Sequence, residues 1–244
     1  MNILYAYLQY RWNSLFIVRK KNDFVCSIED SRRKNKGKLK FEDELLPFRE
    51  ETKNSKRKIE VTDFGAGSKR LGNSRTIQSI YKTSVANRKW QRFMHQLIVD
   101  KKAVEILEMG TSLGFSTVYL SQATKGKVTT IEACPATYDE AKNLFDKLEV
   151  SNIEAVNDTF SNYFEDVEKK KFDFIYLDGH HDGEAVLQYI EQLKPSMAQS
   201  TLILVDDIRW SAGMFAAWNK LLVDDYFSEK NDLFRMGILK KGNV

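Results

Sequence analysis

Short apolar runs alternate with amphipathic segments through the second half of the chain. The runs are rich in branched and aromatic residues and predict strands at 103–109, 127–132, 152–156, 173–178 and 201–206. Helical periodicity between them predicts helices near 115–123, 137–148, 160–168, 182–193 and 211–223. Because strands that alternate with helices form a parallel sheet covered on both faces, the pattern predicts an α/β fold.

The two ends of the chain follow other patterns. The tail predicts a loop over 225–232 and a late strand over 233–240, with a hairpin as the alternative, and either would add an antiparallel edge to the sheet. Ahead of the first strand, one apolar helix face is predicted to pack on the sheet; it consists of Trp90, Phe93, Met94, Leu97 and Ile98. Residues 1–18 predict an amphipathic helix packed on the body, with attachment to a membrane surface as the weaker alternative.

These patterns divide the chain into three parts. Residues 1–60 are predicted to hold the N-terminal helix and a basic, charged segment with few core residues. Residues 61–100 form a helical lead-in, and residues 101–244 form the α/β domain. The glycine-rich stretch Val61–Ser68 is interpreted as a tight turn, because no helical apolar pattern follows it directly.

Length and composition favour a single substantial core. The chain has 244 residues, of which 42% are hydrophobic. The apolar N-terminal stretch is too short and too polar for a membrane span. The two cysteines, Cys26 and Cys134, do not form a disulfide framework, and no signal peptide is recognisable. We therefore expect a cytoplasmic protein.

The net charge of +4 is unevenly distributed: residues 1–90 carry +11 and residues 91–244 carry −7. The basic part could bind nucleic acid, anionic lipid or an anionic substrate. Its densest run, 32–40, has no aromatic residues for base stacking. A solvated segment, docked on the acidic body or on a second subunit, is therefore preferred, nucleic acid is not expected, and a homodimer is possible.

A glycine turn follows the first predicted strand of the α/β domain. Gly110 and Gly114 lie between that strand and the next helix, where backbone N–H groups can approach a ligand that a Cβ would exclude. Glu132 closes the next strand, where a carboxylate suits ribose hydroxyls. A dinucleotide fingerprint needs Gly-x-Gly-x-x-Gly, whereas these glycines are separated by three residues. The turn therefore favours a nucleoside ligand other than NAD.

Polar residues also end the remaining predicted strands. The third is followed by Asn157, Asp158 and Thr159, which could read an adenine edge. Asp178 ends the fourth strand, and Asp206 and Asp207 end the fifth. Three crowded carboxylates repel one another unless a cation joins them or some stay protonated, and oxygen ligands suit Mg²⁺, Mn²⁺ or Ca²⁺. Asp207 has an alternative role as the N-cap of the following helix.

These residues resemble class I S-adenosylmethionine-dependent methyltransferases, most of all the metal-dependent catechol O-methyltransferase-like branch. Residues 103–223 carry the resemblance, which implies a Rossmann-like fold with a mostly parallel seven-stranded sheet, an antiparallel C-terminal edge strand and here an N-terminal helical extension. His180 and His181 after Asp178 also resemble the macrocin-type sugar methyltransferases. The N-terminal section and the Val61–Ser68 stretch suggest an uncharacterised bacterial subgroup.

The resemblance implies roles for individual residues. S-adenosylmethionine would contact Glu108, Gly110, Thr111, Ser112, Gly114, Ser116, Glu132, Ala133, Asp158, Thr159 and Asp178. Mg²⁺, or Mn²⁺ or Ca²⁺, would bind Asp178, Asp206 and Asp207. The branch commonly has a lysine as general base where this chain has His181, so His181, or failing it His180, is the predicted base beside Asp178.

We therefore expect an enzyme that methylates a small-molecule hydroxyl with the assistance of a divalent ion. One alternative is metal-independent methyl transfer to nitrogen or to a sugar hydroxyl. Another is a cofactor-binding interaction protein whose basic N-terminal segment binds nucleic acid or protein. Trp210 and Met214, just after Asp207, could line an apolar substrate site or belong to the core.

Overall fold

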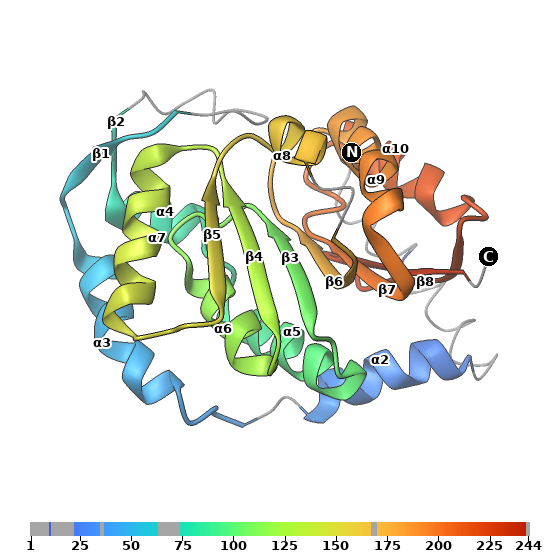
Figure 1. Ribbon diagram of the computed structural model, residues 1–244, viewed down its shortest axis with the longest axis horizontal. Helices are drawn as coiled ribbons and strands as arrows, with labels where there is room; N and C mark the ends of the chain where they lie inside the picture. Colours follow the sequence, from blue (N-terminus) through green and yellow to red (C-terminus); the bar gives the residue numbers. More distant parts are fainter. Residues whose placement is uncertain (1–9, 11–21, 35–36, 63–73, 167–169, 243–244) are drawn as a thin grey trace.

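The computed structural model describes residues 10, 22–34, 37–62, 74–166 and 170–242. A seven-stranded sheet runs through the middle of the molecule in the order β5-β4-β3-β6-β7-β9-β8 (Figure 1). Its strands are β3 (Glu105–Met109), β4 (Lys127–Glu132), β5 (Ile153–Asn157), β6 (Phe172–Leu177), β7 (Met197–Val205), β8 (Phe227–Asp232) and β9 (Gly237–Lys241). The strands from β3 to β7 pair in parallel, and β9 pairs antiparallel with both β7 and β8.

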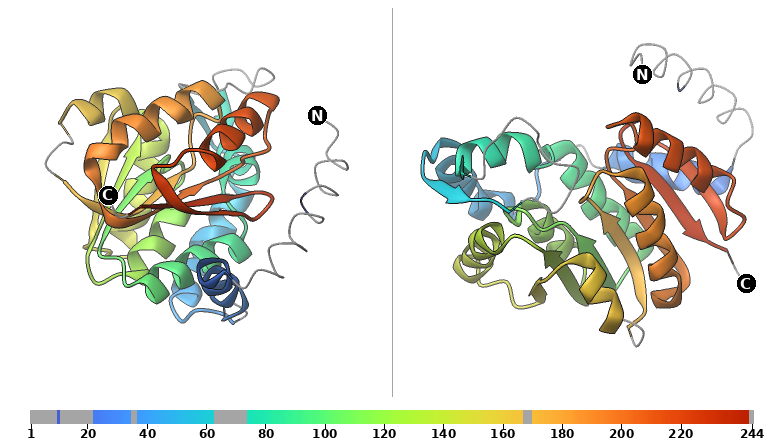
Figure 2. Two further views of the ribbon diagram at one scale, coloured as in Figure 1. Left: turned by 90° about the vertical axis from the view of Figure 1, so that its right-hand side faces the viewer. Right: turned by 90° about the horizontal axis from the view of Figure 1, so that it is seen from above.

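Helices alternate with the parallel strands, as the apolar pattern predicts. They are α6 (Phe115–Ala123), α7 (Pro135–Lys147), α8 (Phe160–Asp166), α9 (Gly183–Leu193) and α10 (Ala212–Leu222). A 3₁₀ turn, Lys194–Ser196, leads into β7. Views along the other two axes place helices on both faces of the sheet (Figure 2). The predicted α/β fold, with its mostly parallel sheet and antiparallel C-terminal edge, is confirmed.

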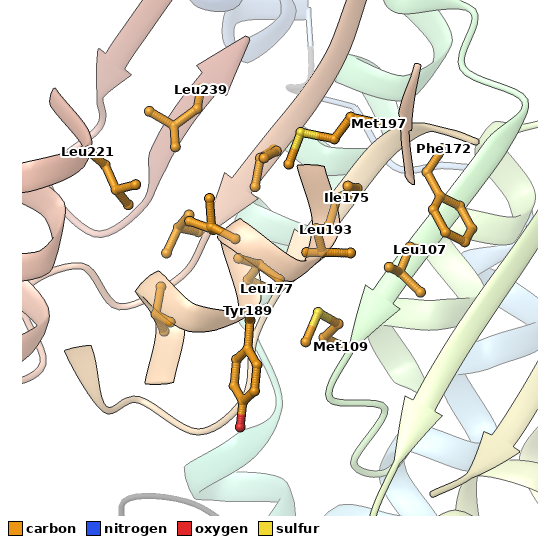
Figure 3. Packing of buried hydrophobic residues seen from close by; sticks show 14 of the residues in the cluster. Leu107, Met109, Phe172, Ile175, Leu177, Tyr189, Leu193, Met197, Leu221 and Leu239 are labelled. Carbon is orange, nitrogen blue, oxygen red and sulfur yellow. The ribbon is translucent and has the colours of Figure 1, made fainter. Parts of the chain in front are cut away.

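Both faces of the central strands are buried. In β6, Ile175 and Leu177 pack with α9 and α10, whereas Phe174 and Tyr176 face α5 (Arg88–Lys101) on the other side. Figure 3 shows the first of these layers, where Tyr189 and Leu193 of α9 lie over the sheet. This burial explains why the strands have continuous apolar runs rather than an alternation of apolar and polar residues.

The tail forms the hairpin that the sequence offered as the alternative. Residues 225–232 are mostly the strand β8 rather than a loop, and Phe227 and Asn231 are buried while the residues between them are partly or fully exposed. The hairpin of β8 and β9 therefore supplies the antiparallel edge with two strands. An outermost strand is apolar on one side only, so its sequence is polar enough to be taken for a loop.

The first part of the chain contains two helices that the sequence did not predict. The charged segment with few core residues holds α2 (Asp23–Lys34) and α3 (Glu42–Asn54). Phe24 and Ile28 of α2 pack against α5, and Leu45 of α3 is fully buried beside α4 (Ile77–Ser84), α6 and α7. Only one or two apolar residues in each helix contact the core, which is too few for a clear periodic signal among so many charges.

The structure describes only some of the residues for which the sequence made predictions ahead of the α/β domain. The apolar face from Phe93 to Ile98 forms the buried side of α5, as predicted. The strands β1 (Lys58–Glu60) and β2 (Ser74–Thr76) pair antiparallel. The predicted helix over 1–18, apart from Tyr10, and most of the Val61–Ser68 turn lie outside the described residues. Within the described part, no helix is long and apolar enough to cross a membrane, and Cys26 and Cys134 are unpaired.

Candidate functional site

The glycine turn between β3 and α6 depends on close backbone contacts. Gly110 has φ +107°, and a Cβ at this position would lie 2.2 Å from the carbonyl oxygen of Asp178. Gly114 has φ +77°, and its Cβ would lie 2.6 Å from the ring of Phe145. Any other residue would therefore push the turn away from β6 and from α7. The two glycines keep the turn flat across the carboxyl ends of the strands.

The carboxylate of Glu132 joins the glycine turn to the loop after β4. One of its oxygens accepts a hydrogen bond from the N–H of Ser112 at 2.8 Å, and the other accepts from the N–H of Cys134 at 2.9 Å. Burial raises the pKa of Glu132, although these two N–H groups favour its ionised form. An ionised carboxylate has about four acceptor positions, so each oxygen can accept a further hydroxyl from a ligand.

Glu108 lies beneath the turn and is fully buried. One of its carboxyl oxygens accepts hydrogen bonds from the hydroxyls of Thr117 in α6, at 2.5 Å, and Thr130 in β4, at 2.7 Å. Thr111 in the turn lies 2.6 Å from the same Thr130 hydroxyl. Within the described part of the chain, the second carboxyl oxygen of Glu108 has no partner. The described contacts of Glu108 therefore hold the turn, β4 and α6 together.

Glu108 makes the stability of the protein depend on pH. Burial raises its pKa from 4.5 to about 7. The folded protein binds this proton more tightly than the unfolded chain, so the contribution to stability is full below pH 4.5 and is lost as the pH rises to about 7. A pKa raised from 4.5 to about 7 corresponds to roughly 3 kcal/mol of stability. We expect Glu108→Gln to gain about this much relative to the unsubstituted protein between pH 4.5 and pH 8.

Urea unfolding at several pH values measures this difference. Glu105→Gln is the matched control, because Glu105 lies on the same strand but is exposed, and its effect should not vary over the same range. A difference between the Glu108→Gln variant and the unsubstituted protein that stays constant with pH would show that Glu108 is ionised throughout.

The residues after β5 begin a helix as well as ending a strand. Asn157 donates to the carbonyl oxygen of Glu132 at 2.7 Å, which fixes the loop after β5 against the loop after β4. A carboxylate oxygen of Asp158 accepts from the N–H of Thr159 and from the amide of Asn162, and the Thr159 hydroxyl accepts from the N–H of Asn162. Asp158 and Thr159 thus lie at the predicted strand end, and their described contacts form the first turn of α8.

The two histidines after Asp178 face different neighbours. The Nε2 atom of His181 lies 3.9 Å from a carboxylate oxygen of Asp178, and its ring lies 5.9 Å from that of Trp210. His180 has φ +56°, and its Nδ1 atom lies 2.6 Å from the hydroxyl of Tyr189 in α9. This contact connects His180 to the α9 layer, so only His181 lies beside the aspartates.

Asp178, Asp206 and Asp207 form one group, here called the aspartate cluster, at the ends of β6 and β7. The hydroxyl of Tyr176 lies 2.9 Å from an oxygen of Asp178 and 3.1 Å from an oxygen of Asp206. A hydroxyl donates only one hydrogen, so the two carboxylates compete for it. Burial, and then the charge of Asp206, raise the pKa of Asp178 well above its usual range and also raise that of Asp207.

A guanidinium group supplies positive charge to the aspartate cluster. Arg235, in the turn between β8 and β9, binds both oxygens of Asp206 at 2.9 Å, and its Nε atom lies 3.3 Å from Asp207. A bidentate pair with a fully buried carboxylate is a strong, charge-assisted contact. Neither Arg235 nor Tyr176 was predicted as a site residue. Tyr176 could have been predicted, because a residue two positions before Asp178 on a strand points to the same face of the sheet. Nothing in the sequence near Arg235 indicates that it lies beside the aspartates.

This arrangement does not fit the predicted metal site. Each oxygen of Asp206 already has two donors: Arg235 donates to both, the N–H of Asp207 also donates to one, and the hydroxyl of Tyr176 lies 3.1 Å from the other, which uses the four acceptor positions of a carboxylate. Among the residues that the structure describes, no group of three or more histidine, cysteine, aspartate or glutamate side chains is placed to hold a metal ion. The aspartates lie together at neighbouring strand ends, and in this structure the positive charge beside Asp206 and Asp207 is that of Arg235.

The residues after the aspartate cluster decide which residue caps α10 and whether Trp210 and Met214 belong to the core. Ser211, not Asp207, caps α10, because its hydroxyl accepts from the N–H of Met214 at 3.0 Å. Met214 is buried in the core, whereas Trp210 is 66% exposed beside His181. Of these two residues, therefore, only Trp210 is free to contact a substrate.

Comparison with known proteins agrees with this geometry. Residues 107–208 match a family model described as a methyltransferase domain. The match runs from β3 to the residues just after β7, and so includes the glycine turn, Glu132 and the aspartate cluster. No curated protein shows significant similarity to the chain.

Several solved structures share the fold. An O-methyltransferase from Bacillus cereus, solved with SAH, is 20% identical over 66% of this chain and 83% of its own, with a TM-score of 0.57. The O-methyltransferase TomG from Streptomyces achromogenes, involved in tomaymycin synthesis and solved with SAM, is 16% identical over 66% and 82%, with a TM-score of 0.58. An SAH-bound methyltransferase from Podospora anserina is 16% identical over 85% and 100%, with a TM-score of 0.59.

Proposed function

We propose, from the premise that the chain carries a class I methyltransferase domain that depends on S-adenosylmethionine, that it methylates a hydroxyl group of a small molecule. The observation that carries the proposal is the placing of Glu132 and the glycine turn at one sheet edge with His181 and the aspartate cluster. The O-methyltransferases from Bacillus cereus and Streptomyces achromogenes, which share the fold, support oxygen as the acceptor.

The glycine turn and its neighbours would hold the cofactor. Gly110 and Gly114 let the turn pack closely against Asp178 and Phe145, and both oxygens of Glu132, fixed by backbone N–H groups, would accept the ribose hydroxyls. The turn residues Thr111 and Ser112, together with Ala133, would contact the cofactor through their backbone. Asp158 and Thr159 would lie on the adenine side. When bound, S-adenosylmethionine supplies a methyl group on a positively charged sulfur, so the protein must align the acceptor and remove its proton.

His181 is the group best placed to remove that proton. Its neutral imidazole would accept the hydroxyl proton through a ring nitrogen, and the imidazolium that forms would be stabilised by Asp178, 3.9 Å away. The exposed ring of Trp210 lies next to His181 and would cover an apolar acceptor. We assign no catalytic contact to His180, because its Nδ1 atom is engaged with Tyr189.

We further propose that transfer proceeds without a divalent ion in the aspartate cluster. Arg235 already neutralises the carboxylate of Asp206, and its Nε atom also lies 3.3 Å from Asp207, so the cluster has a cation of its own. This differs from the metal-assisted reaction that the resemblance implies. The guanidinium of Arg235 would offset the negative charge of the aspartate cluster beside His181, where the acceptor hydroxyl would bind.

The full chain, incubated with S-adenosylmethionine and a panel of phenolic, sugar and amine acceptors, tests the proposal. We expect mass spectrometry to find a methylated oxygen in at least one product and EDTA to leave the rate unchanged. A methylated nitrogen would contradict the assignment of oxygen. A rate that falls with EDTA and returns with Mg²⁺ would contradict the metal-free cluster.

A further inference from the structure

A buried cation lies behind the glycine turn without a carboxylate partner. Arg49 of α3 is 3% exposed. Its nitrogens donate to the hydroxyl of Tyr81 at 3.3 Å and to the amide oxygen of Gln91, and its guanidinium lies 4.8 Å from the ring centre of Phe115. None of the ion pairs between described residues includes Arg49. A buried charge without a counter-ion is costly, so the site is suited to an incoming anion.

The acidic side chain that shares Tyr119 as a neighbour with Arg49 is already engaged. Glu42 of α3 is paired with Arg92 through both of its oxygens and accepts a hydrogen bond from Tyr119 at 2.9 Å. The Arg49 guanidinium lies 5.5 Å from the ring centre of Tyr119, and among the described residues the ion pair of Glu42 is with Arg92, not with Arg49. The pair of Glu42 and Arg92 is therefore complete and leaves the charge of Arg49 uncompensated.

Hydrogen-bond polarity leads from Arg49 to the start of α6. A guanidinium only donates, so the oxygen of Gln91 accepts from Arg49 and its Nε2 atom must donate. The acceptor of that hydrogen is the hydroxyl oxygen of Ser116, at 3.3 Å. Because this oxygen accepts from Gln91, the hydroxyl hydrogen of Ser116 is free to donate to another group. The buried Gln91 thus sets Ser116 as a donor.

Ser116 is the second residue of α6, directly after the glycine turn. The first N–H groups of a helix have no carbonyl partner within it, and they favour an anion. The backbone bond from Val118 to Gly114, at 3.1 Å, is the first of this helix, so the N–H groups before it face the turn. The start of α6 therefore combines open N–H groups, a hydroxyl oriented to donate and a buried positive charge two hydrogen bonds away.

We propose that Arg49 and Gln91 are positioning residues that prepare Ser116 to bind the carboxylate of an amino-acid ligand. The inference rests on the proposed function, in which that ligand is the methionine part of the cofactor. Arg49 lies in α3, outside the 107–208 match, so the N-terminal extension would contribute to the cofactor site. A nucleoside that lacks the carboxylate gains nothing from Arg49 or Gln91.

The variant Gln91→Glu tests this with almost no change in shape. Its carboxylate would pair with Arg49, cancel the buried charge and accept the Ser116 hydroxyl, which would then no longer donate to a ligand. We expect the Kd for S-adenosylhomocysteine, measured by titration calorimetry, to rise roughly tenfold or more. The Kd for 5′-methylthioadenosine, which has no amino-acid part, should stay unchanged, and the Tm should not fall.

Two further variants complete the experiment. Ser116→Ala removes the hydroxyl that accepts from Gln91, and it should cause the same selective loss of affinity for S-adenosylhomocysteine. Arg88→Gln, at an exposed position of the same helix, lowers the net charge by one as Gln91→Glu does and should leave both Kd values unchanged. If Gln91→Glu weakens both ligands equally, or weakens neither, the inference is overturned. If the unsubstituted protein binds neither ligand, both the inference and the proposed function are contradicted. If it binds both ligands with equal affinity, only the inference is overturned.

Discussion

Replacing His181 with glutamine is expected to slow methyl transfer by a factor of about 100 to 10,000, the range typical for loss of a general base. Glutamine keeps a polar side chain of similar length beside Asp178, but its amide cannot take a proton near neutral pH. The acceptor hydroxyl would then have to lose its proton to water. Rates measured at saturating S-adenosylmethionine, with the affinity for S-adenosylhomocysteine determined separately, isolate this effect from cofactor binding.

The neighbouring histidine is the matched control. His180→Asn keeps a residue that tolerates the left-handed backbone conformation at this position and removes only the contact with Tyr189. We expect a lower Tm and a rate within a few-fold of the unsubstituted protein. A large loss of rate in His180→Asn together with full activity in His181→Gln would reverse the assignment of the base.

Replacing Glu132 with glutamine is expected to lower the affinity for S-adenosylhomocysteine about 100-fold or more. The carboxylate accepts two backbone N–H groups and would accept the two ribose hydroxyls. A glutamine amide would turn N–H groups toward at least one of these donors. Two charge-assisted hydrogen bonds, each about 1.5 to 3 kcal/mol, correspond to this loss.

Thermal shift with S-adenosylhomocysteine and NAD measures this prediction. The unsubstituted protein should respond only to the sulfur compound, and Glu132→Gln should not respond. Because burial raises the pKa of Glu132, the affinity of the unsubstituted protein should also fall as the pH drops through that pKa. A shift that is retained in Glu132→Gln, or one caused by NAD alone, would sink the assignment of the ribose site.

Much of the α/β fold was predictable because its signals are local. The parallel strands are buried on both faces, so each is a continuous apolar run that stands out from the amphipathic helices. The elements that were missed have little contact with the core. In α2 and α3 the buried apolar residues are Phe24, Ile28 and Leu45, and β8 is a partly exposed edge strand.

The candidate site divides in the same way. The sequence by itself determined the glycine turn, Glu132 and the aspartates, because in a parallel sheet every strand brings its carboxyl end to the same edge. The resemblance ranked His181 ahead of His180, but only the tertiary structure gave each histidine its neighbours, since adjacent residues on a loop can face opposite layers.

Tertiary structure also decided which cations serve the site. Arg235 follows Asp206 by 29 residues, and Arg49 precedes Gln91 by 42. No local pattern distinguishes these two arginines from the other basic residues of the chain. Their partners are set by the return of the β8–β9 hairpin to β7 and by the packing of α3 beside α6. The chemistry of each strand end is therefore local, whereas the charge that balances it comes from segments distant in sequence.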